Sequence, residues 1–448
     1  MIKNFLTIQW HITEKCNNQC RHCYMTREKK ELSCEEILKI LKNIDDFEKK
    51  WNFEIRNYII TGGDPFLYDN IEFLFKELKK RNKNIAILGN PDTINTKILN
   101  LLKKYNIENF QMSIDGLKER HDYIRKEGSF DLTLEKANFL EKNGVFTNIM
   151  FTVNRENYKD LIPVMEIVAK NNISSFSFDF LCSTGNGKSL NSLTSIEVDN
   201  LLKEYLKKKE ELNKTYSTFF GEKSALFRRL RDENNNFILS KFTLENRPYL
   251  GCYVGYTSFA IASDGSFMPC RRLNEKYGNL LVEKLEDIFL GDERLKKYRR
   301  AEFYDECGAC KYFNFCRGCP AVSKGETGFS LKKLSLCSYK IEHSTIQNSK
   351  IKLDTSKEEE RKIVSKHYMN VFFNNFENNL LKSKKLFDFI LLVTFESEIR
   401  KRFVKEPYKI FQELKIKFTK EELEMIAYYV ELLYMGYTFD LRKYIFGE

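Results

Sequence analysis

Short apolar runs alternate with amphipathic stretches along the first part of the chain. The runs are rich in β-branched and aromatic residues and most end at Gly, Asn or Asp, as strands do. Six such runs are FLTIQWHI (5–12), RNYIITGG (56–63), NIAILGN (84–90), NFQMSIDG (109–116), TNIMFTVN (147–154) and SSFSFDFL (174–181). Apolar residues recur at helical spacing between them, as in 33–47, 70–82 and 130–144. Strands that alternate with helices predict an α/β fold with a parallel sheet, curved into a partial (β/α)6 TIM-like barrel.

Local signals indicate where several helices begin and end. Ser33 and Glu36 predict a capping box at the start of one helix, and Gly144 closes the segment 130–144. Thr419 and Glu422 predict a second capping box near the end of the chain. The carboxyl ends of the strands of such a barrel meet at one face, so residues that directly follow strands are candidates for chemistry.

The pattern divides the chain into three predicted parts. Residues 1–230 hold the barrel, residues 231–343 are rich in cysteine, and residues 344–448 read as helices without cysteine. The last part carries many Lys and Arg and an apolar stripe made of Leu386, Phe389, Ile390 and Val393. This helical extension either caps the cysteine-rich part or binds a substrate.

Composition and charge narrow the function classes. Hydrophobic residues make up 42 % of the 448 residues and charged residues 31 %, as in globular proteins. The longest apolar run, FILLVTF (389–395), is too short to span a bilayer, and the N-terminus lacks a signal-peptide hydrophobic region. We therefore expect a cytoplasmic protein with no membrane partner. The net charge of +11 comes from scattered Lys and Arg with no compact basic block, which argues against nucleic-acid binding.

Twelve cysteines in a chain without a signal peptide favour metal binding over disulfides. Three of them, Cys16, Cys20 and Cys23, have the spacing C-x3-C-x2-C directly after the first predicted strand. Three thiols cannot all pair with one another, and a structural zinc site takes four ligands. A site that is one ligand short leaves a position at which a substrate binds.

Two further segments also follow predicted strands: TGGDPF (61–66) and SIDGLKERHDYIRKEGSF (113–130). With the three cysteines they resemble the motifs of the radical S-adenosylmethionine (radical SAM) enzymes. The resemblance implies a [4Fe-4S] cluster on Cys16, Cys20 and Cys23, whose free iron chelates the amino and carboxylate groups of SAM. Reductive cleavage of SAM then yields a 5′-deoxyadenosyl radical, which abstracts hydrogen from an unactivated C–H bond. A redox-sensitive or zinc-binding cluster is the alternative.

The same resemblance implies which residues contact SAM. Glycines let the backbone approach the methionyl amino group because they lack a Cβ atom, and Asp64 stands where the family usually has Glu. Arg125 is expected to pair with the SAM carboxylate through charge-assisted hydrogen bonds. Asn90 is expected near the ribose and the His22 backbone near adenine. The expected contacts are His22, Gly62, Gly63, Asp64, Asn90, Ser113 and Arg125.

A second group of cysteines has the spacings C-x12-G-x4-C, from Cys252 to Cys270, and C-x2-C-x5-C-x2-C, in CGACKYFNFCRGC (307–319). It resembles the SPASM extension of radical SAM enzymes, with one residue fewer than usual before its last cysteine. The resemblance implies two auxiliary [4Fe-4S] clusters, three in all. The outer set is Cys307, Cys310, Cys316 and Cys337; the inner set is Cys252, Cys270 and Cys319, one ligand short, which leaves an iron open. Zinc ribbons are the alternative. Cys34 and Cys182 are expected to be packing residues, and the alternative for Cys182, near the barrel mouth, is an approach to the active site.

Enzymes with a SPASM domain mostly modify peptides or proteins. The first hypothesis is an oxidoreductase that matures a ribosomally made peptide, by a thioether or other crosslink. Its expected partners are a substrate with a leader segment and an electron donor such as flavodoxin or ferredoxin. An anaerobic sulfatase-maturing enzyme is the second hypothesis, although Arg271 stands where that group has an acidic residue.

A non-catalytic iron–sulfur carrier or scaffold is the third hypothesis, and SAM binding separates it from the other two. The first predicted strand begins at residue 5, so we expect no leader-binding domain before it. The helical extension is the candidate for that role.

Overall fold

The computed structural model describes residues 4–25, 30–51, 53–107, 109–227, 230, 251–310, 312–313, 316–339, 389, 407–419, 422–423 and 426. Most of the predicted helical extension lies outside the described residues, and so do Leu386, Ile390 and Val393 of its apolar stripe.

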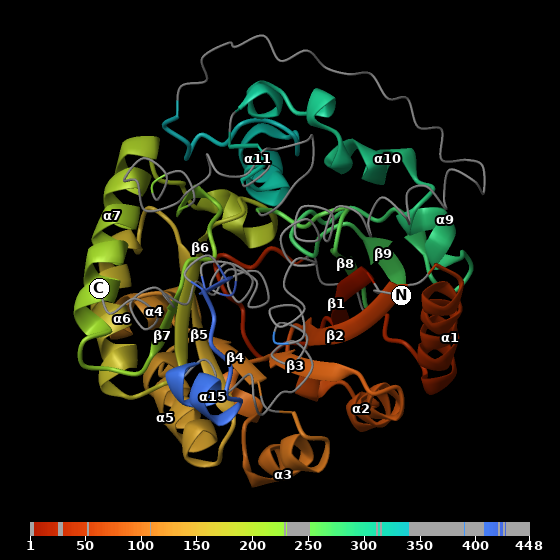
Figure 1. Cartoon of the computed structure of the whole chain (residues 1–448), viewed down its shortest axis with the longest axis horizontal. Coiled ribbons are helices and arrows are strands. Elements are labelled where there is room, and N and C mark those ends of the chain that lie inside the picture. Colours follow the sequence, from red (N-terminus) through yellow and green to blue (C-terminus); the bar gives the residue numbers. More distant parts are fainter. Residues whose placement is uncertain are drawn as a thin grey trace.

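A curved sheet forms the centre of the molecule (Figure 1). Within the described residues it has ten strands in the order β10-β9-β8-β1-β2-β3-β4-β5-β6-β7. All pairs from β8 through β1 to β7 are parallel, whereas β9 is antiparallel to both β8 and β10. The strands are β1 (Asn4–Thr13), β2 (Phe53–Gly62), β3 (Asn84–Leu88), β4 (Asn109–Ser113), β5 (Phe146–Val153), β6 (Ser175–Phe180), β7 (Phe219–Gly221), β8 (Ser258–Ile261), β9 (Ser266–Met268) and β10 (Gly278–Asn279).

The six predicted strands are β1 to β6, and the α/β fold with a partial barrel is confirmed. Two further parallel strands flank them. β7 follows β6, and β8 pairs with the other side of β1, where Thr7 to Trp10 lie opposite Ser258 to Ile261. Because β8 and β9 come from the cysteine-rich part, that part shares its sheet with the barrel.

Helices cover the outer side of the sheet. In Figure 1, α10 and α11 lie above β6, β8 and β9, and α9 lies beside β9. The helices are α1 (Cys34–Trp51), α2 (Ile71–Lys80), α3 (Thr96–Lys104), α4 (Lys118–Ile124), α5 (Ser129–Lys142), α6 (Leu161–Lys170), α7 (Ser195–Leu212), α9 (Leu285–Phe289), α10 (Glu293–Lys296), α11 (Pro320–Thr327) and α15 (Pro407–Glu413). Short 3-10 turns include η1 (Pro65–Leu67), η2 (Pro91–Thr93) and η4 (Gly185–Ser189).

Both predicted capping boxes are confirmed. Ser33 N donates to Glu36 Oε2 at 2.9 Å, and Glu36 N donates to Ser33 Oγ at 3.2 Å. Thr419 N donates to Glu422 Oε2 at 2.8 Å, and Glu422 N returns a hydrogen bond to Thr419 Oγ1 at 3.2 Å. Gly144, just after α5, has a φ of 80°, as a residue that ends a helix does.

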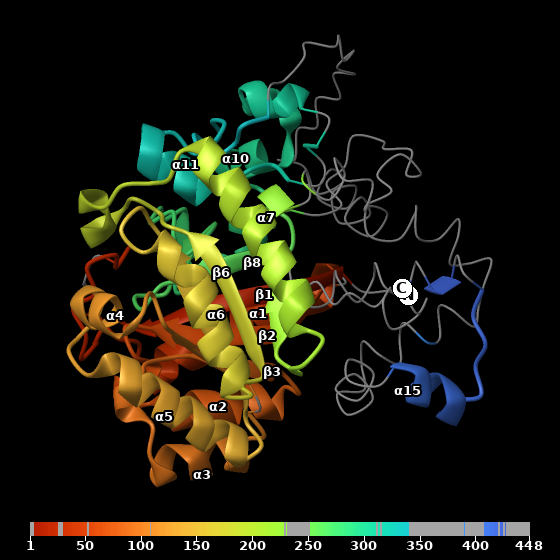
Figure 2. The same ribbon diagram turned by 90° about the vertical axis from the view of Figure 1, so that its left-hand side faces the viewer.

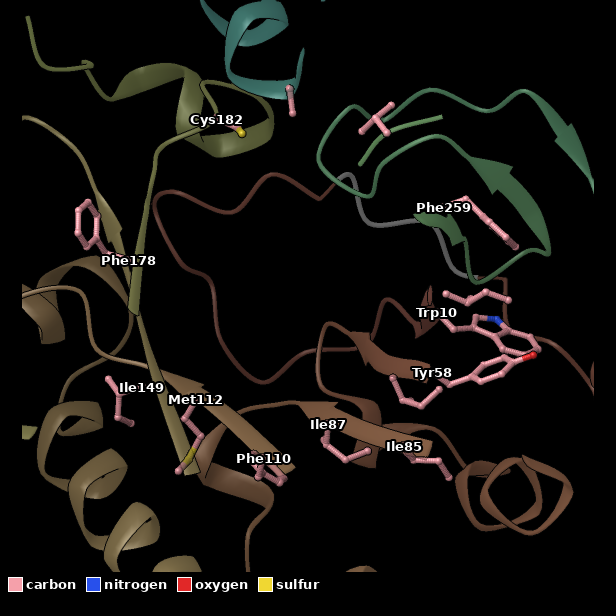
Figure 3. Close-up of a cluster of buried hydrophobic side chains, with 14 of the residues drawn as sticks. Trp10, Tyr58, Ile85, Ile87, Phe110, Met112, Ile149, Phe178, Cys182 and Phe259 are labelled. Atoms are coloured by element: carbon pink, nitrogen blue, oxygen red, sulfur yellow. The ribbon is translucent and has the colours of Figure 1, made fainter. Parts of the chain in front are cut away.

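Residues along the strands alternate between an apolar face and a polar face. The apolar face packs against the helices, and Figure 3 shows its side chains following the sheet from Phe259 on β8 through Trp10 on β1 to Phe178 on β6. The opposite face carries polar residues, among them Gln111 and Asn148, whose side chains share a hydrogen bond of 3.1 Å from Asn148 Nδ2. The inside of the curved sheet is therefore polar.

The described part of the helical extension has a small aromatic cluster of its own. The Phe389 ring centroid lies 5.3 Å from that of Phe411 and 5.1 Å from that of Phe418. Figure 2 shows α15 set off from the sheet and its covering helices. Phe389 of the predicted apolar stripe is thus buried within the extension.

Candidate active site

The predicted three-cysteine loop follows β1 at the carboxyl end of the sheet. Burial raises the pKa of the Cys20 thiol above its ordinary value. The thiolates of Cys16 and Cys23 add to this rise in pKa, so the three sulfur atoms lie near one another. Cys16 Sγ also accepts a hydrogen bond from Asn18 N at 3.4 Å. All three cysteines are only partly buried, which leaves them accessible to a ligand.

Gly62 and Gly63 pack the loop after β2 directly against the cysteine loop. Gly63 N donates to Thr13 O at 3.0 Å, and Asp64 N donates to Lys15 O at 2.8 Å. A Cβ atom at Gly63 would lie 2.1 Å from Lys15 O and 2.7 Å from the Cys16 Cβ atom. Only glycine fits at this close approach, so the two loops form one continuous cradle.

Asp64 and Asn90 both contact the cysteine loop next to this cradle. The Asp64 carboxylate accepts hydrogen bonds from Phe66 N at 3.1 Å and Thr93 Oγ1 at 2.9 Å. Burial raises the pKa of Asp64 to about 6 despite these hydrogen bonds. Asn90 Nδ2 donates to Cys16 Sγ at 3.3 Å. Asn90 thus faces the cysteine loop, and its expected place near the ribose stays a prediction. The Asp64 carboxylate is engaged by protein groups.

Arg125 lies beside the cysteine loop at the end of α4. Its Nε atom donates to the carboxylate of Asp115, its Nη1 lies 3.9 Å from Cys20 Sγ, and its Nη2 lies 3.4 Å from His22 Nε2. Burial raises the pKa of Asp115, but Arg125, His22, His121 and the Thr152 N–H together outweigh burial, and the net pKa is lowered. Burial lowers the pKa of His22 to about 4, so its imidazole is neutral near pH 7. The predicted SAM contacts His22 and Arg125 therefore converge on a buried anion.

Asp115 was not predicted as a site residue. The sequence signal for it was the Asp of the SIDG motif, two residues after the predicted Ser113. Ser113 is the last residue of β4 and lies opposite Met150 of β5. The Asp115 carboxylate also accepts a hydrogen bond from Thr152 N at 2.6 Å. The position of Asp115 after β4 is therefore fixed by its hydrogen bonds to Thr152 on β5 and to Arg125 at the end of α4.

The loop that contains η4 packs against the cysteine loop, and this contact was also not predicted. Asn186 N donates to Cys23 O at 2.8 Å, and Asn186 Nδ2 donates to Cys20 O at 3.2 Å. A Cβ atom at Gly185, whose φ is 56°, would lie 2.5 Å from Cys23 O. The glycine-rich run STGNGKS after β6 was the available signal.

The structure brings the predicted outer cysteines together. Burial raises the pKa of Cys307, and the thiolates of Cys316, Cys310 and Cys337 raise it further. Burial likewise raises the pKa of Cys316 to about 12, although its sulfur accepts a hydrogen bond from Gly318 N at 3.4 Å. Cys307, Cys310, Cys316 and Cys337 thus lie within electrostatic reach of one another, and four thiols form the kind of soft donor set that iron–sulfur clusters use.

The predicted inner cysteines also lie together. Burial and the thiolates of Cys319 and Cys270 raise the pKa of Cys252 to about 12. A hydrogen bond from Cys182 lowers the pKa of Cys319 to about 6. Cys182, expected to be a packing residue, therefore adjoins this set, while Cys34 begins α1.

Three cationic side chains reach the polar inside of the barrel near these cysteines: those of Lys223, Arg271 and Arg272. Burial lowers the pKa of Lys223 to about 8, and its Nζ lies 3.8 Å from the sulfur atom of Met150 on β5. Burial and the charge of Arg271 lower the pKa of His11 to about 3. Arg272 Nη2 pairs with Asp179 Oδ2 at 2.9 Å. Among the described residues, neither Lys223 nor Arg271 forms an ion pair.

Two protein families match parts of the chain. The radical SAM superfamily matches residues 10–168, and SPASM, described as an iron–sulfur cluster-binding domain, matches residues 252–320. These domains imply [4Fe-4S] clusters and SAM, and the clustered thiols and the glycine cradle fit such groups. Within the part of the chain that the structure describes, each helix is too short or too polar to cross a bilayer.

Curated relatives and solved structures resemble most of the chain. The AdoMet-dependent heme synthase of Oleidesulfovibrio alaskensis is 26 % identical over 74 % of this chain and 87 % of its own length. The antilisterial bacteriocin subtilosin biosynthesis protein AlbA of Bacillus subtilis is 23 % identical over 74 % of this chain and 70 % of its own length. Streptococcus suis SuiB bound to its precursor peptide SuiA has the same fold, with a TM-score of 0.59, 20 % identity, and coverage of 75 % of this chain and 76 % of SuiB.

Proposed function

This chain belongs to the radical SAM enzymes that carry a SPASM domain, and from that premise we propose that it modifies a ribosomally synthesised peptide. Two likenesses support a peptide substrate. AlbA is named for bacteriocin biosynthesis, and SuiB was solved with a precursor peptide. The modification is the loss of a C–H hydrogen from the peptide, followed by a crosslink or a related change.

In this proposal Cys16, Cys20 and Cys23 hold the [4Fe-4S] cluster to which SAM binds. Cluster and SAM together supply the hydrogen-abstracting radical of the family. The Gly62–Gly63 cradle, Asn90 and Ser113 form the surrounding wall. Arg125 keeps a positive charge beside the cysteine loop, where it attracts the SAM carboxylate, and Asp115 fixes its orientation.

The observation that carries this proposal is the meeting of four segments at the carboxyl ends of the strands. The cysteine loop contacts the glycine loop after β2, Asn90 after β3, and Arg125 after β4. All of them lie at the mouth of the polar interior. A substrate that enters this interior comes next to the radical source.

The proposal is tested with the anaerobically reconstituted enzyme, SAM and dithionite. Short cysteine-rich reading frames next to the gene supply the candidate peptides. We expect 5′-deoxyadenosine to form together with a peptide that has lost hydrogen, both measured by mass spectrometry. SAM cleavage with every adjacent peptide unchanged in mass would contradict the peptide substrate while leaving the enzyme family intact.

A second candidate substrate is a carboxylate-bearing heme precursor. Two observations favour it: the heme synthase relative, and the cations Lys223 and Arg271 inside the barrel, which form no ion pair with any described residue. Porphyrin precursors of heme carry several carboxylates, which such cations bind. Incubation with iron coproporphyrin in place of peptide, followed by mass spectrometry of the porphyrin, separates the two candidates.

The sulfatase-maturing hypothesis receives less support. Arg271, which stands where that group has its acidic residue, lies over the Tyr24 ring with its guanidinium 5.6 Å from the ring centroid. A guanidinium is always protonated and cannot act as a base.

The proposed electron donor is a flavodoxin or ferredoxin.

A further inference from the structure

Cys182 lies where the barrel meets the SPASM domain. It follows β6 by two residues, and its side chain is 5 % exposed. A hydrogen bond joins its thiol to the sulfur of Cys319, which immediately precedes α11. Figure 3 shows Cys182 in the loop beneath α11. Two cysteines that are far apart in the sequence therefore meet at one point.

Independent contacts hold the loop after β6 against the segment that carries Cys319. A Cβ atom at Gly325 of α11 would lie 2.7 Å from Ser183 N, so the helix packs directly on the backbone next to Cys182. Arg272 bridges the same two segments. Its Nη2 lies 2.9 Å from Asp179 Oδ2 and 3.5 Å from Cys319 Sγ. The approach of Cys182 is thus built into the backbone packing.

The inner set of cysteines lacks one member relative to the outer set. The outer set has four neighbouring thiols, whereas the inner set has Cys252, Cys270 and Cys319. A [4Fe-4S] cluster offers one coordination position per iron to the protein. A fourth thiol next to Cys319 is therefore in the place where a ligand is missing.

We propose that Cys182 is the fourth ligand of the inner auxiliary cluster. This proposal rests on the proposed function, in which the SPASM domain binds iron rather than zinc. On ligation the Cys182 S–H bond breaks, the proton leaves to solvent, and the thiolate lone pair forms the bond to iron. No electron is transferred in this step.

A fourth cysteine changes what the inner cluster does. With every iron ligated, a substrate thiol finds no vacant position there, in contrast to the open iron expected from the sequence. The inner cluster then acts as an electron relay between the barrel and the outer cluster. Cys182 also links the end of β6 to the SPASM domain through metal–ligand bonds.

The test uses full-length protein in which Cys16, Cys20 and Cys23 are Ala, so that only auxiliary clusters remain. After anaerobic reconstitution and reduction, 13C-cyanide probes for an iron without a protein ligand, and electron–nuclear double resonance detects its coupling. We expect no coupling with Cys182 intact and none in the matched control Cys34→Ala. We expect coupling after Cys182→Ala and shifted g values after Cys182→Ser.

Coupling with Cys182 intact would overturn the proposal, because an iron would then be open already. A Cys182→Ala protein that keeps its iron, its spectrum and its resistance to cyanide would also overturn it. If the Cys182→Ala protein loses the inner cluster, the Cys182→Ser protein decides. Shifted g values in Cys182→Ser would support ligation by Cys182, and a spectrum identical to that of the protein with Cys182 intact would overturn it. Intact protein with bound zinc and no iron would instead contradict the proposed function, which total metal analysis reveals separately.

Discussion

The buried carboxylate of Asp115 accepts a hydrogen bond from Arg125 Nε, and this pair holds the guanidinium against the cysteine loop. Asp115 is 0 % exposed and the Arg125 side chain 13 %. Arg125 Nη1 lies 3.9 Å from Cys20 Sγ. The ion pair is therefore part of the candidate SAM site, and its removal affects both the fold and the ligand.

Replacing Asp115 with Asn leaves Arg125 as a buried charge without its anion. Breaking a buried pair in this way costs about 3–5 kcal/mol of stability. We expect a lower unfolding midpoint and SAM affinity weakened on the order of tenfold or more. Asp69→Asn is the matched control, because the Asp69 side chain is 89 % exposed. Unchanged SAM affinity in isothermal titration of Asp115→Asn would show that the pair does not orient Arg125 for SAM.

Replacing Gly63 with Ala drives a methyl group into the Lys15 carbonyl, 2.1 Å away. We expect the cysteine loop to move and the catalytic cluster to be lost on reconstitution, while the auxiliary clusters remain. Gly128→Ala is the control: Gly128, unlike Gly63, has a φ of 75°, but nothing lies within 4 Å of the added atom. It should cost only about 1 kcal/mol of strain. Iron content and electron paramagnetic resonance measure the difference, and equal spectra for the two variants would refute the cradle.

Asp64 predicts a pH dependence of stability. Its folded pKa of about 6 lies above its unfolded value, so ionisation opposes folding and stability falls as pH rises through this range. The full penalty, reached above pH 7, is about 3 kcal/mol, and about 1 kcal/mol of it is relieved between pH 7.5 and pH 5.5. Asp64→Asn should be more stable than wild type at pH 7.5, and its advantage should shrink at pH 5.5. Anaerobic denaturation at both pH values tests this, and a constant difference would contradict it.

Lys223 and Arg271, for which the described part of the chain supplies no ion-pair partner, predict a preference for acidic substrate groups. Lys223→Met and Arg271→Gln should each raise the KM for substrate, by roughly tenfold for one lost charge-assisted hydrogen bond. SAM cleavage without substrate should change little. Lys203→Met, at an exposed lysine of α7, is the control. An unchanged KM in both interior variants would remove these residues from substrate binding.

Local features of the fold were readable from the sequence. Strands β1 to β6 and both capping boxes depend on residues that are close in the sequence, such as Ser33 with Glu36, and all are confirmed. The family motifs also identified the radical SAM and SPASM domains. Strand β7 has three residues and β8 four, too few for alternation to reveal them.

Features that depend on tertiary contacts were not readable. Asp115 acquires its importance from Arg125 and from Thr152 on β5, which only the folded sheet brings together. Asn186 supports the cysteine loop through its backbone N and its side-chain Nδ2, and the glycine-rich run that contains it does not show which loop it contacts. Cys182 looked like a packing residue because its neighbour Cys319 lies in another domain. The roles of the SAM contacts and cluster ligands stay predictions until ligand is bound.

The rate of 5′-deoxyadenosine formation in a protein with Cys16, Cys20 and Cys23 replaced by Ala tests the central claim most directly. Wild-type protein and the triple variant are reconstituted anaerobically and incubated with SAM and dithionite. We expect no 5′-deoxyadenosine from the variant and the loss of about four of about twelve irons, with the auxiliary clusters retained. Formation of 5′-deoxyadenosine at the wild-type rate would contradict it.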